Sequence, residues 1–91
     1  MTGANAQMTE TEKQSMVGRE FIHFKGNRYR IEGFARDTET QEEVVVYRAL
    51  YGEGGLWVRP ARMFFETIER NGRRIRRFAL AEGDGGNGRS G

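Results

Sequence analysis

An aromatic–arginine cluster is the feature of this sequence most able to do chemistry. Two neighbouring apolar segments supply its members, which are Tyr47, Arg48, Tyr51, Trp57 and Arg59. Side chains alternate between the two faces of a strand, so Tyr47 and Tyr51 share one face. Trp57 and Arg59 share a face for the same reason. A tryptophan beside an arginine is typical of binding hot spots and of surfaces that stack nucleic-acid bases.

Two interpretations of Trp57 remain open at this level. If Leu56 and Val58 face the core, Trp57 and Arg59 point outward and form a binding surface. Alternatively, Trp57 closes one end of a small barrel and Arg59 stacks over its ring. The first interpretation predicts a binding module, and the second a purely structural role.

The arginine run near the C-terminal end is a second candidate for binding. Between residues 70 and 77 it includes Arg74 and Arg76 beside three further arginines. On a hairpin these side chains divide between the two faces, where they are solvated or pair with nearby acids. The alternative is a contact surface for phosphates or acidic partners.

The usual catalytic groups are missing or badly placed. The chain has no cysteine, Ser15 and Ser90 lie near its ends, and His23 is its single histidine. One histidine without cysteine makes no zinc site, and the acids between residues 37 and 43 read as an exposed turn. The glycine-rich Gly52–Gly55 segment lacks the lysine of a phosphate-binding loop. We expect no enzyme activity, cofactor or metal.

Two short hairpins must position these residues. Gly26-Asn27 is a favoured two-residue turn, and this predicts that Phe24 faces Tyr29 and Ile22 faces Ile31. The same register places His23 opposite Arg30, on the outer face. Asn71-Gly72 is the stronger signal, and it predicts three pairs of opposing residues, which are Ile68 with Ile75, Glu69 with Arg74, and Phe65 with Phe78.

The remaining segments also read as strands. Glu43–Tyr51 carries three consecutive valines, and Leu56–Arg59 is a short strand that ends at Pro60. Pro60–Phe64 predicts a single turn of α- or 3₁₀-helix. Five to six short antiparallel strands without a long helix predict an all-β fold, either a small barrel or a strongly bent sheet. A small SH3-like barrel is the first choice.

Length and composition predict a single domain between two tails. The 91 residues allow one domain, which we place at residues 19–80, with disordered tails at residues 1–18 and 81–91. No apolar run could cross a bilayer or serve as a signal peptide, so we expect a cytoplasmic protein without membrane contact. We expect it to be a monomer or a weak homodimer.

Several motifs resemble a family of small bacterial domains of unknown function. They are Val45-Val46-Tyr47-Arg48-Ala49-Leu50-Tyr51-Gly52, Leu56-Trp57-Val58-Arg59-Pro60 and Met63-Phe64, with the two hairpin turns on either side. The resemblance covers roughly residues 20–78 and implies a compact β-barrel, but no activity. One departure is Ile75-Arg76, where a proline is expected before Arg77-Phe78.

Together these observations predict a non-enzymatic binding module. Its partner is a protein or peptide that contacts the groove around the aromatic–arginine cluster. The alternative is an RNA- or DNA-binding module that uses the same aromatic residues and the arginine-rich hairpin. Steep loss of affinity with salt distinguishes the second from the first.

Overall fold

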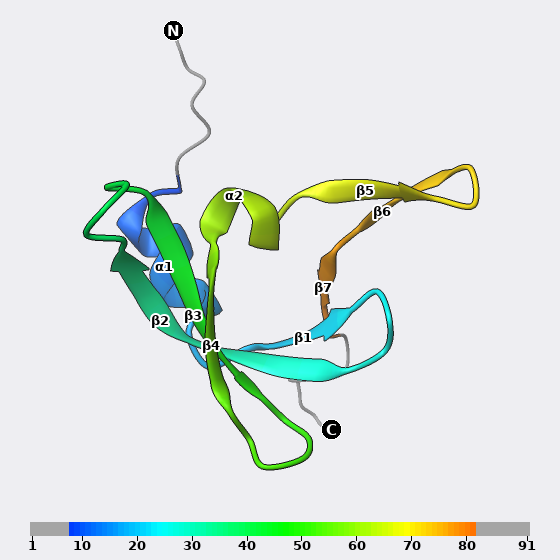
Figure 1. Ribbon diagram of the computed structural model, residues 1–91, viewed down its shortest axis with the longest axis horizontal. Coiled ribbons are helices and arrows are strands. Elements are labelled where there is room, and N and C mark those ends of the chain that lie inside the picture. The colour runs from blue at the N-terminus through cyan, green and yellow to red at the C-terminus, as the bar shows by residue number, and fades with distance from the viewer. Residues whose placement is uncertain (1–7, 82–91) are drawn as a thin grey trace, which may run out of the picture.

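Strands dominate residues 8–81, the part of the chain that the computed structural model describes (Figure 1). The elements, in chain order, are α1 (Glu10–Met16), β1 (Glu20–His23), β2 (Arg28–Arg36), β3 (Glu43–Ala49), β4 (Leu56–Pro60), α2 (Ala61–Phe64), β5 (Thr67–Arg70), β6 (Arg73–Arg76) and β7 (Phe78–Leu80). The predicted all-β class is therefore confirmed. So is the helical turn after Pro60, which is α2.

The main sheet has five antiparallel strands in the order β4-β3-β2-β1-β7, and β5 and β6 form a separate hairpin. In Figure 1 that hairpin projects away from the sheet, on the side opposite α1. Among the described residues β4 and β7 are the two edges and do not pair with each other, so the sheet is bent but open. The predicted small SH3-like barrel is therefore not closed, and the strongly bent sheet, which was the alternative, is the form observed. The described part also has seven strands instead of five or six.

The last predicted strand divides because the chain changes partner at Arg77. The Asn71-Gly72 turn has φ angles of 55° and 77°, and Ile68 pairs with Ile75 as predicted. After Arg77, however, Phe78 pairs with His23 of β1 and not with Phe65. The Phe24 N–H donates to the Arg77 carbonyl at 2.9 Å, which begins this new ladder. The change of partner carries Phe78 from the hairpin into the core.

The first hairpin has a different register from the predicted one. Phe21 pairs with Tyr29, whereas the prediction placed Phe24 there. The loop has three residues and not two, since the His23 N–H donates to the Asn27 carbonyl at 2.8 Å. Gly26, at φ 110°, takes the last loop position, which favours glycine in such loops. The register is shifted by three residues, and a shift by an odd number exchanges the two faces of a strand. Phe21 is therefore buried, with 5% of its surface exposed.

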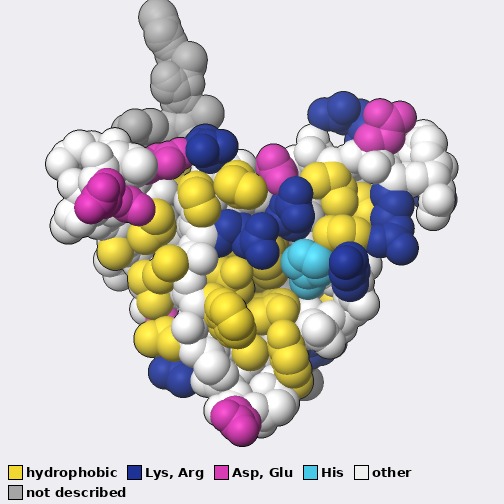
Figure 2. Space-filling model, in the orientation of Figure 1, with side chains coloured by type: hydrophobic (Ala, Val, Ile, Leu, Met, Phe, Trp, Pro, Cys, Tyr) yellow, Lys and Arg dark blue, Asp and Glu magenta, His cyan; other side chains and the backbone are white. Residues whose placement is uncertain are grey.

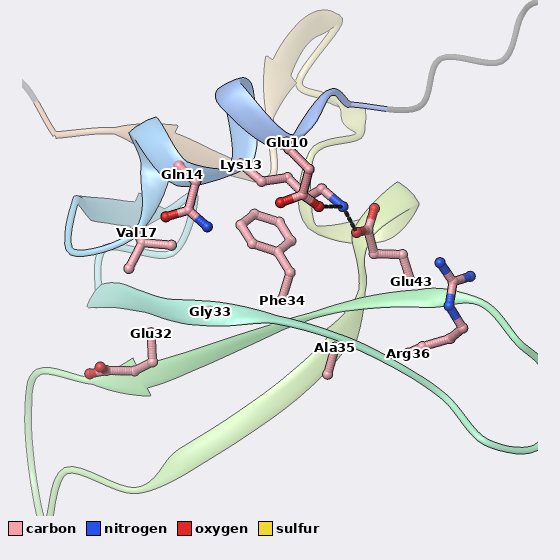
Figure 3. A pocket seen from close by; sticks show the side chains of 10 residues that line it. All are labelled: Glu10, Lys13, Gln14, Val17, Glu32, Gly33, Phe34, Ala35, Arg36 and Glu43. Carbon is pink, nitrogen blue, oxygen red and sulfur yellow. Dashed lines mark hydrogen bonds and ion pairs between the residues drawn. The ribbon is translucent and has the colours of Figure 1, made fainter.

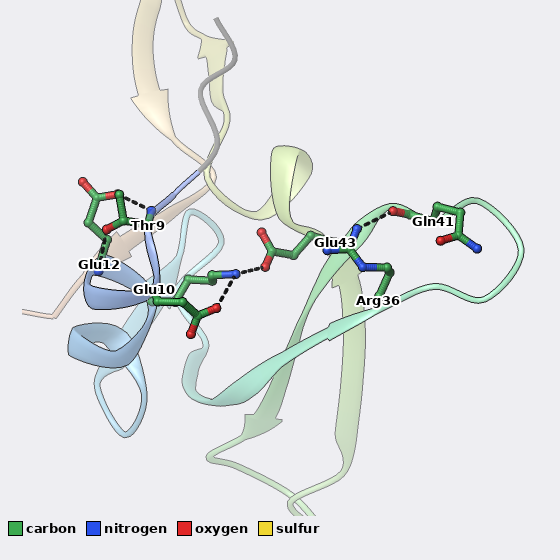
Figure 4. Close-up of polar contacts among 7 residues, drawn as sticks. Thr9, Glu10, Glu12, Arg36, Gln41 and Glu43 are labelled. Carbon is green, nitrogen blue, oxygen red and sulfur yellow. Dashed lines mark hydrogen bonds and ion pairs between the residues drawn. The ribbon is translucent and has the colours of Figure 1, made fainter. Parts of the chain in front are cut away.

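Helix α1 lies in the predicted N-terminal tail, so the prediction of disorder is wrong from residue 10 to residue 16. Its N-terminus is a capping box: the Thr9 hydroxyl accepts from the Glu12 N–H, and the Glu12 carboxylate accepts from the Thr9 N–H. Figure 4 shows this cap and the bridge from Lys13 to Glu10 and to Glu43 of β3. Met16 packs against the core.

The core lies between the bent sheet and α2. Its buried side chains are Phe21, Ile31, Val45, Tyr47, Phe64 and Phe78. Phe64 reaches it from α2 and stacks on Phe78, with ring centroids 4.0 Å apart and planes 5° apart. Ala81 is also buried, and its N–H donates to the Glu20 carbonyl, so the ordered part extends one residue into the predicted C-terminal tail. The rest of that tail, like residues 1–7, lies outside the described residues.

Candidate functional site

Aromatic rings form a continuous floor on the inner side of the bent sheet. The rings of Tyr29, Tyr47 and Phe78 contact one another edge to face, with centroid distances of 5.3 to 5.5 Å. Tyr47 is only 4% exposed because β3 is a central strand and its alternation places Val45, Tyr47 and Ala49 inward. Tyr47, which the sequence placed among the binding residues, is therefore buried, and its ring contributes to the floor of this surface.

Arg59 lies on this floor. It is opposite Val45 in the β3–β4 register, so it shares the inner face of the sheet. Its Nε donates to the Tyr47 hydroxyl at 3.3 Å, and its guanidinium lies 5.5 Å from the centre of the Phe78 ring. Within residues 8–81 it contacts no carboxylate, unlike Arg48, Arg62 and Arg77. Within the part of the chain that the structure describes, its positive charge is therefore stabilised by π-electrons and a hydroxyl.

Trp57 and Tyr51 form the exposed edge of this surface. Trp57 is opposite Tyr47 and 56% exposed, and Tyr51 is 45% exposed. The Tyr51 and Tyr29 hydroxyls are hydrogen-bonded at 2.8 Å. Burial, together with this hydrogen bond, raises the pKa of Tyr29 to about 12. The Tyr29 hydroxyl thus stays protonated near neutral pH and adds no charge to the surface.

His23 completes the surface, and sequence reasoning missed it. The corrected register of β1 turns it inward, where its ring lies 4.9 Å from that of Phe78 and 6.4 Å from that of Tyr29. Burial lowers the pKa of His23, and the positive charge of Arg59 lowers it further. His23 is therefore neutral near pH 7. The sequence signal was Gly26, which permits a three-residue loop as readily as a two-residue turn.

We call this surface the aromatic–arginine face, which consists of His23, Tyr29, Tyr47, Tyr51, Trp57, Arg59 and Phe78. Figure 2 views the molecule from the same side as Figure 1. Apolar side chains fill the middle of the view, lysines and arginines border them beside the histidine, and acidic side chains lie toward the outline. The surface is thus apolar and cationic.

The structure separates the other predicted site residues from this face. Arg48 points to the opposite side of the sheet, where it binds the Glu32 carboxylate at 3.2 Å and the Gly54 carbonyl at 2.8 Å. Arg74 and Arg76 belong to the separate hairpin, and they bind the Thr67 hydroxyl and the Phe65 carbonyl. Of the seven predicted residues, Tyr47, Tyr51, Trp57 and Arg59 therefore belong to the aromatic–arginine face, and Tyr47 is its one buried member among these four.

Two hollows lie elsewhere on the molecule. One, of about 510 Å³, lies between α1 and β2, where Phe34 points toward the helix beneath the Lys13–Glu43 bridge (Figure 3). The other, of about 300 Å³, lies beside α1, β1 and β7 and is lined by Phe21, Phe65 and Leu80 with Arg19 and Arg76. Three carboxylates, of Glu10, Glu32 and Glu43, line the larger hollow, and Lys13 forms ion pairs with Glu10 and Glu43.

Residues 8–81 contain neither a metal-binding cluster nor a membrane-spanning helix. No group of three His, Asp or Glu side chains there is arranged to hold a metal ion. Neither helix in that range has the length and apolar character needed to cross a membrane.

The fold and the face define a small all-β domain with an open, bent sheet and an apolar, cationic inner surface. Residues 19–80 match the family described as Protein of unknown function (DUF1653), and the chain belongs to this family. The resemblance to a family of unknown function is thereby confirmed. A crystal structure of a family member from Bordetella bronchiseptica is similar, with 35% identity and a TM-score of 0.65. The match covers 76% of this chain and 91% of that one. No curated protein matches the chain.

Proposed function

We propose that this domain is a non-enzymatic protein-interaction module whose aromatic–arginine face binds an acidic segment of a partner protein. One observation carries the proposal. Arg59 lies over an aromatic floor and, within residues 8–81, has no carboxylate partner. A partner carboxylate would complete a charge-assisted hydrogen bond there, and the planar guanidinium can bind it through two parallel N–H groups.

The exposed aromatic side chains support the same proposal. Trp57 and Tyr51 present large, stiff, apolar surfaces beside Arg59, and residues of these three types dominate the energetics of protein interfaces. Neutral His23 and the protonated hydroxyl of Tyr29 can donate or accept hydrogen bonds without repelling an anion. The face therefore combines hydrophobic contact with one anchoring charge.

Nucleic-acid binding is the second candidate, and the arginines of the β5–β6 hairpin favour it. Within the described residues Arg73, Arg74 and Arg76 bind no carboxylate, and Arg70 lies 5.0 Å from the centre of the Phe24 ring. Arg74 and Arg76 belong to a different sheet from Arg59, however. Several other cations are neutralised by ion pairs, so the domain lacks the continuous basic track typical of nucleic-acid binding.

The fluorescence of Trp57, the single tryptophan, tests the proposal directly. Two probes are titrated: a peptide of about eight residues with alternating glutamate and valine, and single-stranded oligothymidine. We expect saturable quenching by the peptide. The variant Arg59→Ala should bind it about tenfold more weakly, because one charge-assisted hydrogen bond is worth roughly 1.5–3 kcal/mol.

Arg73→Ala is the matched control, since it removes the same charge from a solvent-exposed site in the hairpin. It should bind the peptide as the parent chain does. The proposal is wrong if both variants lose equal affinity, or if only oligothymidine quenches. The second outcome would establish nucleic-acid binding if the logarithm of the affinity also fell with salt at a slope of about −0.7 per phosphate contact.

A further inference from the structure

Strand β4 is an open edge of the main sheet with an unusual apolar surface. Three consecutive residues each expose more than half of their surface: Leu56 at 54%, Trp57 at 56% and Val58 at 64%. Leu56 and Val58 therefore do not face the core, which was the condition of one of the two interpretations of Trp57. Natural sheets usually protect such edges with charges, bulges or short strands, because an apolar edge pairs readily with another strand.

The backbone groups available at this edge follow from the β3–β4 ladder. The Ala49 N–H donates to the Gly55 carbonyl at 2.9 Å, so Ala49 and Gly55 form a hydrogen-bonded pair. Such pairs alternate along an antiparallel ladder, so Trp57 and Arg59 also bond to β3, opposite Tyr47 and Val45.

The outward groups belong to the residues between those pairs. Leu56 and Val58 direct their N–H and C=O groups away from β3, and no described strand lies on that side. Pro60, which has no N–H, is the next outward residue, as is typical of prolines at sheet edges. Pro60 therefore limits how far a further strand can pair along β4. The outward N–H groups are confined to the short segment that contains Leu56 and Val58.

We propose that the partner's acidic segment binds by adding an antiparallel strand to β4, with its backbone paired to Leu56 and Val58. This inference rests on the proposed function. It also predicts an alternating pattern in the partner. Residues opposite Trp57 and Arg59 lie over the aromatic–arginine face, and the one opposite Arg59 is acidic. Residues opposite Leu56 and Val58 lie on the outer face and are apolar.

A partner protein fits this edge better than a second copy of the chain does. In the antiparallel register that uses the outward groups of Leu56 and Val58 in both copies, Leu56 pairs with Val58. Trp57 then faces the other Trp57, and Arg59 faces Gly55, so Arg59 receives no carboxylate. The terminal segments are poor candidates too, because residues 82–91 contain five glycines and no apolar residue.

Backbone methylation of the glutamate–valine peptide tests the pairing without changing the protein. Methylating a peptide N–H removes one donor. In an added strand alternate N–H groups face β4, so we expect affinity to fall about fivefold to tenfold at every second position only, because one hydrogen bond is worth roughly 1 kcal/mol. Equal losses at all positions, or no loss at any, would overturn strand addition.

Val58→Pro tests the same pairing from the protein side. It removes the outward N–H of residue 58 and leaves the β3–β4 hydrogen bonds in place. Val58→Ala is the matched control, since it removes the exposed side chain and keeps the N–H. We expect Val58→Pro to bind the peptide about fivefold more weakly than Val58→Ala. Circular dichroism checks the fold of each variant, and the methylation series decides alone if the proline variant is unfolded.

The outcomes separate the two proposals. If the peptide fails to bind, or binds independently of Arg59, the proposed function fails. If it binds through Arg59 without alternation in the methylation series, the proposed function holds and strand addition fails. Sedimentation equilibrium of the full chain without peptide provides a further check. A dimer that Val58→Pro dissociates and Val58→Ala does not would assign the edge to a second copy and overturn the proposal.

Discussion

At the residue scale, Arg59 and Arg77 show how the contacts of a guanidinium determine whether it can bind another molecule. Both lie close enough to His23 to lower its pKa. The Arg77 guanidinium is neutralised by the Glu66 carboxylate, and the Arg77 backbone bonds to Glu66 and to Phe24 between β6 and β7. Arg59 has an aromatic ring and a hydroxyl in place of a carboxylate. Arg59 is therefore available to a partner, whereas Arg77 is committed to the fold.

His23 predicts a dependence of stability on pH. Its pKa in the folded state lies below the ordinary value of 6.5, so the unfolded chain takes up the proton first as pH falls. Its contribution to stability is therefore fully present above about pH 6.5 and declines as pH falls through the folded-state pKa. Urea unfolding at about pH 7.5 and about pH 5 measures this change.

His23→Asn is the control for this prediction. Its amide oxygen can replace Nδ1 as the acceptor for the Lys25 N–H, and it does not titrate in this range. The parent chain should lose more stability than His23→Asn between the two pH values. Equal losses would show that His23 has the same pKa in the folded and unfolded chain.

At the element scale, α1 shows how a short polar segment becomes ordered. Seven residues are too few for a stable isolated helix, and none of them is buried. The helix is held by its capping box, by the bridge from Lys13 to Glu43, and by the packing of Met16 on the core. The capping box and a few tertiary contacts together order α1, so the folded part of the chain begins before residue 19.

The cap supplies a prediction for this element. Thr9→Ala should cost about 1 kcal/mol of helix stability, because it removes a side-chain acceptor from the first turn. Thr11→Ala is the matched control, since Thr11 lies inside the exposed first turn and alanine favours a helix there. Amide hydrogen exchange should become faster in α1 for Thr9→Ala only. Unchanged exchange in Thr9→Ala would mean that tertiary contacts alone order α1.

At the scale of the whole molecule, aromatic packing across the open side of the sheet replaces barrel closure. The chain has no cysteine, and a domain of this size buries a limited core. Phe64 projects from α2 between the two ends of the sheet and stacks on Phe78 of β7, while its ring also contacts those of Tyr47 and Phe21. The opening that remains is where the aromatic–arginine face lies.

Phe64 should therefore be essential to the whole fold. Phe64→Ala removes a ring that is fully buried and should cost about 3–5 kcal/mol, a large part of the stability of a small domain. Phe65→Ala is the matched control, because the neighbouring ring is only partly buried. It should cost clearly less in urea unfolding. Equal costs would mean that α2 stabilises the domain by general hydrophobic contact and not by filling the opening.

The sequence determined the elements whose signals are local. Three valines marked β3, Pro60 marked the start of α2, and Asn71-Gly72 fixed the register of the β5–β6 hairpin. Each of these depends on propensity, on a fixed φ angle or on a turn that one residue pair specifies. A local signal for α1 was also present, since Thr9 and Glu12 have the spacing of a capping box, but it was not recognised.

Only the tertiary structure decided which face each strand buries and where the aromatic residues meet. The first hairpin has a three-residue loop, residues 24–26, in place of the predicted Gly26-Asn27 turn. The resulting register exchanged the two faces of β1, buried Phe21 and turned His23 inward. The change of partner at Arg77 brought Phe78 under Arg59, and the edge position of β4 left Trp57 exposed. Alternation predicts which residues share a face. Which face is buried, and which strand lies at an edge, depends on contacts between segments far apart in the chain.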